Sequence, residues 1–138
     1  MNKFINGFIL TIFILSNVSA YAINWVQAET QNGKVAFVDK DSLLKKDKYY
    51  FYNIKYKTKP QDEFKILTVQ SALHNAYSAR LKTYTEQEYD NLHGDYQNIA
   101  NNFNPKLELA VYGSVVHSCH KKVRELMEEE QIPRITVE

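Results

Sequence analysis

YYFYNIKYK, residues Tyr49–Lys57, is the stretch of sequence that decides the fold of this chain. Its even positions are all tyrosine or isoleucine, whereas its odd positions mix aromatic side chains with Asn53, Lys55 and Lys57. Because successive side chains on a strand point to opposite faces, this period of two predicts a β-strand. The uneven polarity of the two faces predicts that the strand is half-buried, with its even face toward the core.

The sequence before this stretch predicts a β-hairpin. Residues 24–29 (NWVQAE) and 34–39 (KVAFVD) have strand composition, and the Gln31-Asn32-Gly33 segment between them is a turn signal. Residues 40–48 (KDSLLKKDK) are too charged and too short for a core helix. They predict a turn with its two leucines tucked beneath it.

The sequence after this stretch predicts more strands and one unusual connection. Alternation from residue 65 to 81 predicts one long strand, or two strands that meet near His74-Asn75. Residues 86–106 are polar and asparagine-rich, and such a length is unusual for a plain loop in a compact domain. We expect them to form a binding loop, a covered hairpin or a mobile insertion. Residues 107–112 (LELAVY) predict another short strand.

The end of the chain predicts a helix over residues 114–131, with Ser114 as its N-cap and its end before Pro133. Its apolar side chains recur at helical spacing, so we expect them to pack on the sheet. The predicted fold class is α+β, an antiparallel meander of about four to six strands with this helix across one face. The side chains expected to point into the core are Trp25, Val35, Phe37, Tyr52, Ile54, Val69, Leu109, Val115, Cys119, Val123 and Leu126.

Residues 1–22 predict a secretory signal peptide. Lys3 precedes an apolar run over residues 8–15, and Ala20-Tyr21-Ala22 matches the small-x-small pattern that a signal peptidase cuts after. A retained membrane anchor is the alternative, but the run is far shorter than the ~18 residues that span a bilayer. The expectation is therefore a protein exported to the periplasm, the cell surface or the medium, with its mature chain starting at Ile23.

Composition limits the classes of partner. Cleavage after residue 22 leaves 116 of 138 residues, enough for the single domain that we expect over residues 23–138. This part has 16 basic and 16 acidic side chains, so it lacks the basic excess of a nucleic-acid or membrane-surface binder. Cys119 is its only cysteine, which rules out an internal disulfide. We expect this thiol to be buried, or else to pair with another chain.

The residues do not predict a catalytic, cofactor or metal site. His117, Cys119 and His120 are the only cluster of metal-ligand types, but Cys119 points away from the two histidines on a helix. Asp39-Lys40-Asp41-Ser42 begins like a calcium loop, yet leucines stand where an oxygen ligand and a glycine are needed. We expect its Asp and Ser side chains to bond the backbone of a turn instead.

The order of several short motifs resembles the surface-adhesin protein E family of bacterial exported proteins. The motifs, spread over most of the chain after residue 22, are Trp25-Val26, Phe37-Val38-Asp39 with Ser42-Leu43, Lys55-Tyr56-Lys57, Ser71, Ala79-Arg80 and Tyr112-Gly113-Ser114. The resemblance implies a small antiparallel sheet covered by a C-terminal helix, in or on the cell envelope, and adhesion to host extracellular-matrix proteins. Members often carry a cysteine where this chain has Tyr77, so the bridge from sheet to helix is absent.

We expect a non-enzymatic binding domain, with a structural envelope protein and an enzyme as the alternatives. An enzyme would gather His74, His93 or Glu88 in a pocket, whereas a binding domain would expose an aromatic patch. The partner would be a host matrix protein, an envelope protein or a second copy of the chain. The side chains expected to bind it, together with residues 86–106, are Tyr49, Lys55, Lys57 and Arg80.

Overall fold

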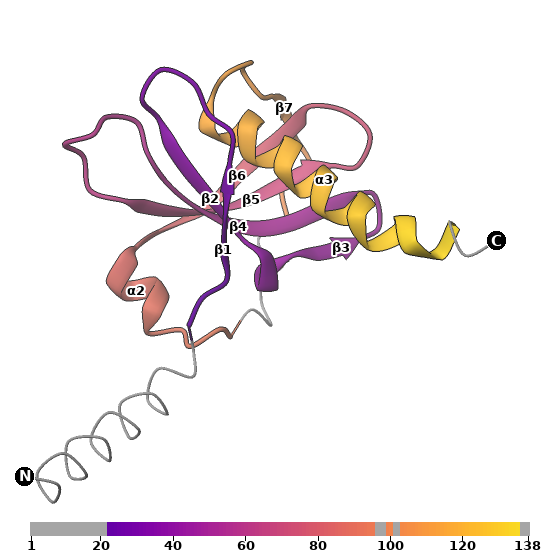
Figure 1. Cartoon of the computed structure of the whole chain (residues 1–138), viewed down its shortest axis with the longest axis horizontal. Coiled ribbons are helices and arrows are strands. Elements are labelled where there is room, and N and C mark those ends of the chain that lie inside the picture. Colours follow the sequence, from indigo (N-terminus) through magenta and orange to yellow (C-terminus); the bar gives the residue numbers. More distant parts are fainter. Residues whose placement is uncertain (1–21, 96–98, 101–102, 136–138) are drawn as a thin grey trace, which may run out of the picture.

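The computed structural model describes residues 22–95, 99–100 and 103–135, with side chains to residue 128. All but the last residue of the predicted signal peptide lies outside these residues. The chain forms an α+β fold in which a seven-stranded antiparallel sheet carries a long C-terminal helix across one face (Figure 1). The strands are β1 (Trp25–Ala28), β2 (Val35–Asp39), β3 (Leu44–Lys46), β4 (Tyr49–Lys57), β5 (Lys65–Ala72), β6 (Tyr77–Thr85) and β7 (Glu108–Leu109). The helices are the 3₁₀ turn η2 (Lys40–Ser42), α2 (Glu86–Asp90) and α3 (Val115–Ile135).

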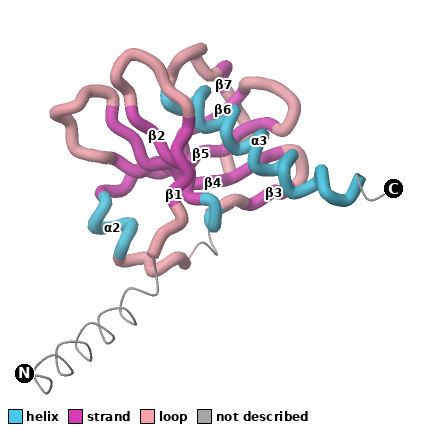
Figure 2. The backbone as a smooth tube through the Cα atoms, in the orientation of Figure 1, coloured by secondary structure: helices cyan, strands magenta, loops and turns pink. Residues whose placement is uncertain are grey.

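The strands follow the order β1-β2-β4-β5-β6-β7, with β3 paired to β4 beside β2 (Figure 2). The predicted hairpin is confirmed as β1 and β2, and its turn uses the positive φ angles of Asn32 and Gly33, 58° and 75°. Residues 65–81 belong to two strands, β5 and β6, rather than one. The strand β3 was not predicted, because its composition, Leu-Lys-Lys, carries no strand signal. Leu44 was predicted to lie beneath a turn, but it is exposed on this strand.

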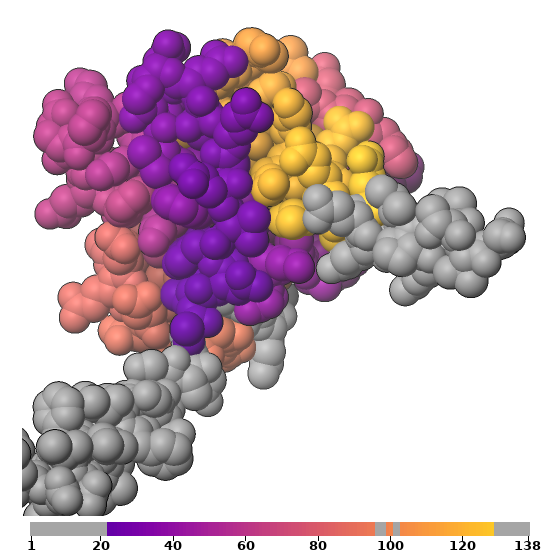
Figure 3. Space-filling model, viewed as in Figure 1, coloured from indigo at the N-terminus to yellow at the C-terminus, as the bar shows by residue number. Residues whose placement is uncertain are grey.

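The main core lies between α3 and the even-numbered side chains of β4. Tyr52 and Ile54 pack there with Val69 of β5 and with the apolar stripe of α3, confirming the predicted helix–sheet contact. Figure 3 shows α3 beside the β1–β2 hairpin, which it also contacts. The buried stripe of α3 consists of Val115, Val116, Cys119, Val123 and Leu126.

Three parts of the predicted core were wrong. On β2 the buried side chains facing α3 are Ala36 and Val38, whereas Val35 and Phe37 point to the other face and are only partly buried. The register of β2 on β4 fixes this choice, because Val38 lies opposite the core residue Ile54. Leu109 is 63% exposed and lies on β7, an edge strand of only two residues. Trp25 is also only partly buried.

The second face of the sheet is covered as well, so β4 is not half-buried along its middle. Phe51 and Asn53 are as deeply buried as Tyr52 and Ile54. Tyr89 of α2 covers this face, and its hydroxyl donates to Asp39 Oδ2 at 2.6 Å and accepts from Asn53 Nδ2 at 2.9 Å. Buried polar atoms with such partners avoid the cost of lost hydration. A polar layer therefore holds α2 against the sheet.

The two ends of α3 compare differently with the prediction. Ser114 caps the helix as expected, because its Oγ accepts from the backbone N–H of His117 at 3.2 Å. The helix runs to Ile135 rather than ending before Pro133. A proline in the last turn costs one hydrogen bond but does not by itself stop a helix. Within the described residues, no helix is both long and apolar enough to cross a bilayer.

Candidate functional site

The sheet has an incomplete edge where β7 pairs with β6. The pairing consists of Tyr77 opposite Leu109 and Ser78 opposite Glu108, extended by the N–H of Ala110 donating to the carbonyl of Ala76 at 2.8 Å. No described strand pairs with residues 79–85 of β6 on that side. The N–H of Thr85 already donates to Glu88, so residues 79–84 leave roughly 20 Å of strand edge open at a rise of about 3.4 Å per residue.

A buried glutamine fixes the start of the segment that leads into β7. The side-chain oxygen of Gln70 accepts from the backbone N–H of Asn104 at 2.8 Å, and its amide donates to the Asn104 carbonyl at 3.1 Å. Gln70 is fully buried on β5, so both bonds are shielded from water. The Gln70 side chain thus satisfies both the backbone N–H and the carbonyl of Asn104, as the backbone of a neighbouring strand would. It holds the chain beside β6 without strand pairing.

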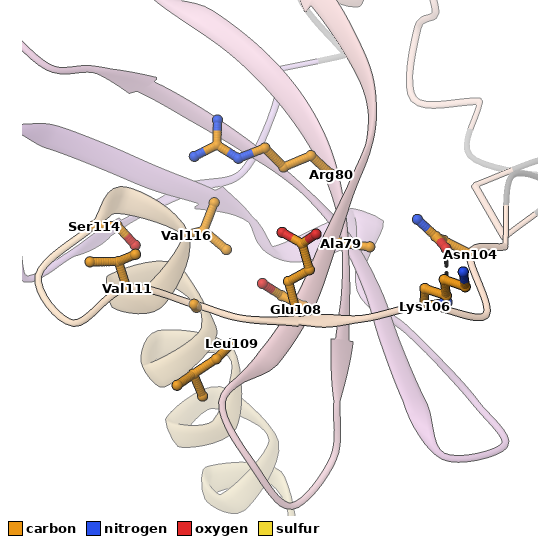
Figure 4. A pocket seen from close by; sticks show the side chains of 11 residues that line it. Ala79, Arg80, Asn104, Lys106, Glu108, Leu109, Val111, Ser114 and Val116 are labelled. Atoms are coloured by element: carbon orange, nitrogen blue, oxygen red, sulfur yellow. Dashed lines mark hydrogen bonds between the residues drawn. The ribbon is translucent and has the colours of Figure 1, made fainter.

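A hollow of about 430 Å³ opens between β6 and this segment (Figure 4). Its charged lining residues are Arg80 on β6 and, on the segment that includes β7, Glu108 and Lys106, the last of which lies beside Asn104. Ala79, Val111 and Val116 are among its apolar lining. The lining of the hollow therefore combines two residues with cationic side chains and one residue with a carboxylate with apolar walls.

Exposed apolar side chains gather at the same edge. The described part of the chain has six large apolar side chains that are exposed. Four of them lie on β7, opposite it or within three residues after it, and they form what we term the β7 patch: Tyr77 (44%), Leu109 (63%), Val111 (73%) and Tyr112 (78%). Exposed apolar side chains that gather in this way mark contact surfaces.

The structure separates the four side chains that the sequence predicted to bind a partner. Tyr49, Lys55 and Lys57 share the odd face of β4, away from α3. Arg80 lies on the opposite face, because it pairs with Val69, a core residue beneath α3. The four residues therefore do not share one face of the sheet.

A β-bulge explains the position of Arg80. Val69 pairs with Arg80 but its neighbour Thr68 pairs with Lys82, so Leu81 is an extra residue in β6. Val69 and Thr68 point to opposite faces, and so do the side chains paired with them. Lys82 consequently joins the second face, where its Nζ lies 4.9 Å from the ring centre of Tyr84.

Lys55 is engaged inside the protein rather than presented to a partner. Its Nζ lies 4.9 to 5.2 Å from the ring centres of Trp25, Phe37 and Phe64 and 3.9 Å from the Glu86 carboxylate. Cation–π contacts of this kind stabilise by about 0.5 to 2 kcal/mol. Lys57 covers the outer side of the Phe64 ring at 4.7 Å. These lysines hold the aromatic cluster together.

Tyr49 lies at the other end of β4, beside a second hollow of about 620 Å³. Its ring packs edge-on against Phe103 with the ring centres 5.2 Å apart. Of the three side chains that an enzyme was expected to gather, this hollow holds only His74. Glu88 instead accepts from the backbone N–H of Thr85 at the start of α2. That bond lowers the pKa of the Glu88 carboxyl.

The long polar connection after β6 is partly regular. It begins with α2, whose capping box joins Thr85 and Glu88 by reciprocal side-chain to backbone bonds of 3.0 and 3.1 Å. It is neither a hairpin nor a plain loop in its described part, and residues 96–98 and 101–102 lie outside the described residues. Asn104 returns the chain to the sheet.

The remaining ligand-type side chains have structural surroundings. Cys119 is fully buried, as predicted, and burial raises the pKa of its thiol to about 12. His120 donates from Nε2 to the Ala72 carbonyl at 2.9 Å, and its burial lowers the imidazole pKa. In the region that the structure describes, no three metal-ligating side chains converge. At η2, Asp39 accepts from the Asp41 N–H at 3.1 Å and Ser42 donates to the Asp39 carbonyl at 2.7 Å, which confirms the predicted turn.

The sequence contains one signal for the β7 patch that the strand prediction passed over. Residues 109–112 are all apolar, without the alternation that lets an edge strand bury one face and expose the other. Some of these side chains therefore have to face solvent. Comparisons with protein-family models, with curated proteins and with solved structures found no match.

Proposed function

We propose that this chain is an exported, non-enzymatic domain that binds a protein partner at the β7 patch. The observation that carries the proposal is the concentration of exposed apolar side chains there, with Val111 and Tyr112 more than 70% exposed. Side chains of this type are excluded from water when a partner covers them, and burial releases about 25 cal/mol per Å² of apolar surface. The resemblance to the surface-adhesin protein E family supports this proposal, and it implies a partner in the host extracellular matrix or in the bacterial envelope.

The position of the patch also supports binding. It lies at the edge of a sheet that α3 covers on one face and α2 on the other, so a partner can approach without displacing the core. The hollow beside it, lined by Arg80, Lys106 and Glu108, supplies polar groups at the rim. An apolar centre with a polar rim is the usual arrangement of protein interfaces.

Capture experiments with matched variants test the proposal. The chain from Ile23 is immobilised and exposed separately to purified extracellular-matrix proteins and to envelope extract. The patch variant carries Leu109→Ser and Val111→Ser, and the control carries Leu44→Ser and Phe103→Ser, which remove two exposed apolar side chains elsewhere. We expect a protein that the wild type and the control retain and the patch variant loses by at least about tenfold, the effect of roughly 1.4 kcal/mol.

Two other results would refute the proposal. Equal retention of the partner by the patch variant would show that the partner binds elsewhere on the molecule. Retention of no specific protein, by a chain that sedimentation shows to be monomeric, would favour a purely structural envelope role. A concentration-dependent dimer that the patch variant abolishes would identify the partner as a second copy.

A further inference from the structure

The open edge of β6 offers backbone groups as well as side chains. On the side away from β5, residues 79–85 pair with no strand among the described residues, because β7 stops after two residues. Unpaired N–H and C=O groups along an edge strand are a template for a further strand. This edge adjoins the β7 patch through Tyr77 and Ser78, the two residues that β7 does pair with.

Two cationic side chains stand on this edge, one toward each face of the sheet. The bulge at Leu81 sends Arg80 to the α3 face and Lys82 to the other face. Both are exposed, and neither lies within 4.0 Å of a carboxylate in the described part of the chain. Of the nearby acids, Glu86 pairs with Lys55, whereas Glu88 accepts from Thr85 and also faces the Lys82 ammonium, which contributes to its lowered pKa. Glu108 lies in the hollow with Arg80 and Lys106.

The same charges argue against pairing between two copies of this chain. If two copies paired antiparallel along the whole of residues 79–85, Lys82 would lie directly opposite its own counterpart at the centre. Like charges directly opposite each other destabilise a strand pair. Lysines and bulges on edge strands are the usual protection against such self-association. A strand that carries acidic side chains meets no such barrier.

We propose that residues 79–85 of β6 bind an extended, acidic segment of a partner protein as an added antiparallel strand, with neighbouring carboxylates opposite Arg80 and Lys82. This inference rests on the proposed function and names the chemistry of its partner. A strand that spans the bulge as β5 does presents two consecutive residues to Arg80 and Lys82, which lie on opposite faces. Backbone pairing gives affinity in this mode, and the side chains give specificity. The hollow beside Arg80 receives a side chain of the added strand.

Peptides of defined composition test the inference. The probe is a peptide of about nine residues, rich in valine and threonine, with two adjacent glutamates at its centre. Its first comparison has lysines in place of the glutamates. Its second keeps the glutamates but is N-methylated on alternate amides, which removes the hydrogen bonds of one strand edge and leaves the charge unchanged. Backbone amide signals of the protein are followed by NMR up to about 1 mM peptide, where even weak binding is visible.

The expected result is slowed amide exchange and shifted signals within residues 79–85 with the acidic peptide alone. A variant with Arg80→Glu and Lys82→Glu should lose this response and gain one toward the lysine peptide. The control variant, with Lys45→Glu and Lys46→Glu on the edge strand β3, makes the same change of charge and should keep it. Equal urea midpoints of the two variants show that both fold, because all four side chains are exposed.

Two results would overturn the inference. An unchanged response to the N-methylated peptide would mean that charge attraction without strand pairing explains binding. No response within residues 79–85 at the highest peptide concentration would rule out strand addition at this edge. Either result leaves the proposed function intact if the β7 patch variant still loses its captured partner, so the two failures are distinguishable.

Discussion

Replacing Tyr89 by phenylalanine tests the polar layer that joins α2 to the sheet. The hydroxyl of Tyr89 donates to Asp39 Oδ2 at 2.6 Å and accepts from Asn53 Nδ2 at 2.9 Å, and all three side chains are buried. The substitution keeps the ring and its packing against Trp25, whose ring centre is 5.6 Å away. It therefore removes two hydrogen bonds with almost no change in packing.

The size of the effect follows from the charge on the acceptor. A hydrogen bond to a charged group contributes about 1.5 to 3 kcal/mol, and a neutral one about 1 kcal/mol. Because both bonds are lost, we expect Tyr89→Phe to lower the free energy of unfolding by about 2.5 to 4 kcal/mol. A loss of about 2 kcal/mol is a change of roughly thirtyfold in the unfolding equilibrium.

Two other tyrosines in the same protein serve as controls for the effect of removing a hydroxyl group. Tyr52 is also buried, but its hydroxyl bonds the neutral Ser71 Oγ at 2.6 Å, so Tyr52→Phe should cost about 1 kcal/mol. Tyr112 is 78% exposed, so Tyr112→Phe should cost about 0 to 0.5 kcal/mol. The predicted order of destabilisation is Tyr89, then Tyr52, then Tyr112.

Urea unfolding followed by circular dichroism measures all three variants. With a slope of about 1.5 kcal/mol per M, Tyr89→Phe should lower the midpoint by roughly 2 M at an unchanged slope. A midpoint for Tyr89→Phe equal to or above that of Tyr52→Phe would refute the reasoning. It would mean that the Tyr89–Asp39 bond does not stabilise the fold more than a neutral pair does.

Three further predictions concern single residues. Cys119 should react with a thiol reagent far more slowly in the native protein than in denaturant, because burial raises the pKa of its thiol to about 12. Cys119→Ala should lower the free energy of unfolding in urea by about 1 to 2 kcal/mol. Rapid labelling of the native protein would contradict the burial of Cys119. Burial lowers the pKa of His120 in the folded state, so the unfolded chain binds the proton more readily and the urea midpoint should fall as pH drops below about 6.5 and level off below the folded pKa. This slope should vanish in His120→Asn and persist in His74→Asn, in which the substituted histidine is exposed. Thr85→Ala should weaken the start of α2 by about 1 kcal/mol, seen as faster amide exchange at Glu88, while Thr83→Ala on the exposed strand should leave that exchange unchanged.

The sequence allowed the fold class to be predicted because its main signals are local. The period of two over residues 49–57, the Asn32-Gly33 turn and the Ser114 cap each depend on neighbours in the chain, and the strand, the turn and the cap that they predict are confirmed. The predicted half-burial of β4 was wrong, because α2 covers its second face. The choice of buried face on β2 was wrong, because it depends on the register with β4 rather than on the composition of β2.

The candidate site was harder to predict, because one inserted residue controls it. The extra residue Leu81 puts Arg80 and Lys82 on opposite faces, where regular alternation would put them on the same face, and no pattern in the residues around it marks a bulge. The exposure of Leu109 likewise depends on how soon β7 leaves the sheet. Neither the face of a side chain beyond a bulge nor the length of an edge strand follows from local periodicity.

The Gln70–Asn104 contact has a consequence for how this protein tolerates change in length. The contact fixes one point of the connection between α2 and β7, so the residues before Asn104 and those after it are separate spans. Insertions before the fixed point are expected to leave β7 in place, whereas a shift of two residues after it would change how far β7 runs along β6. The extent of free strand edge on this molecule therefore depends on one glutamine side chain in the interior. A substitution of the buried Gln70 would therefore alter how much of the β6 edge is exposed at the surface.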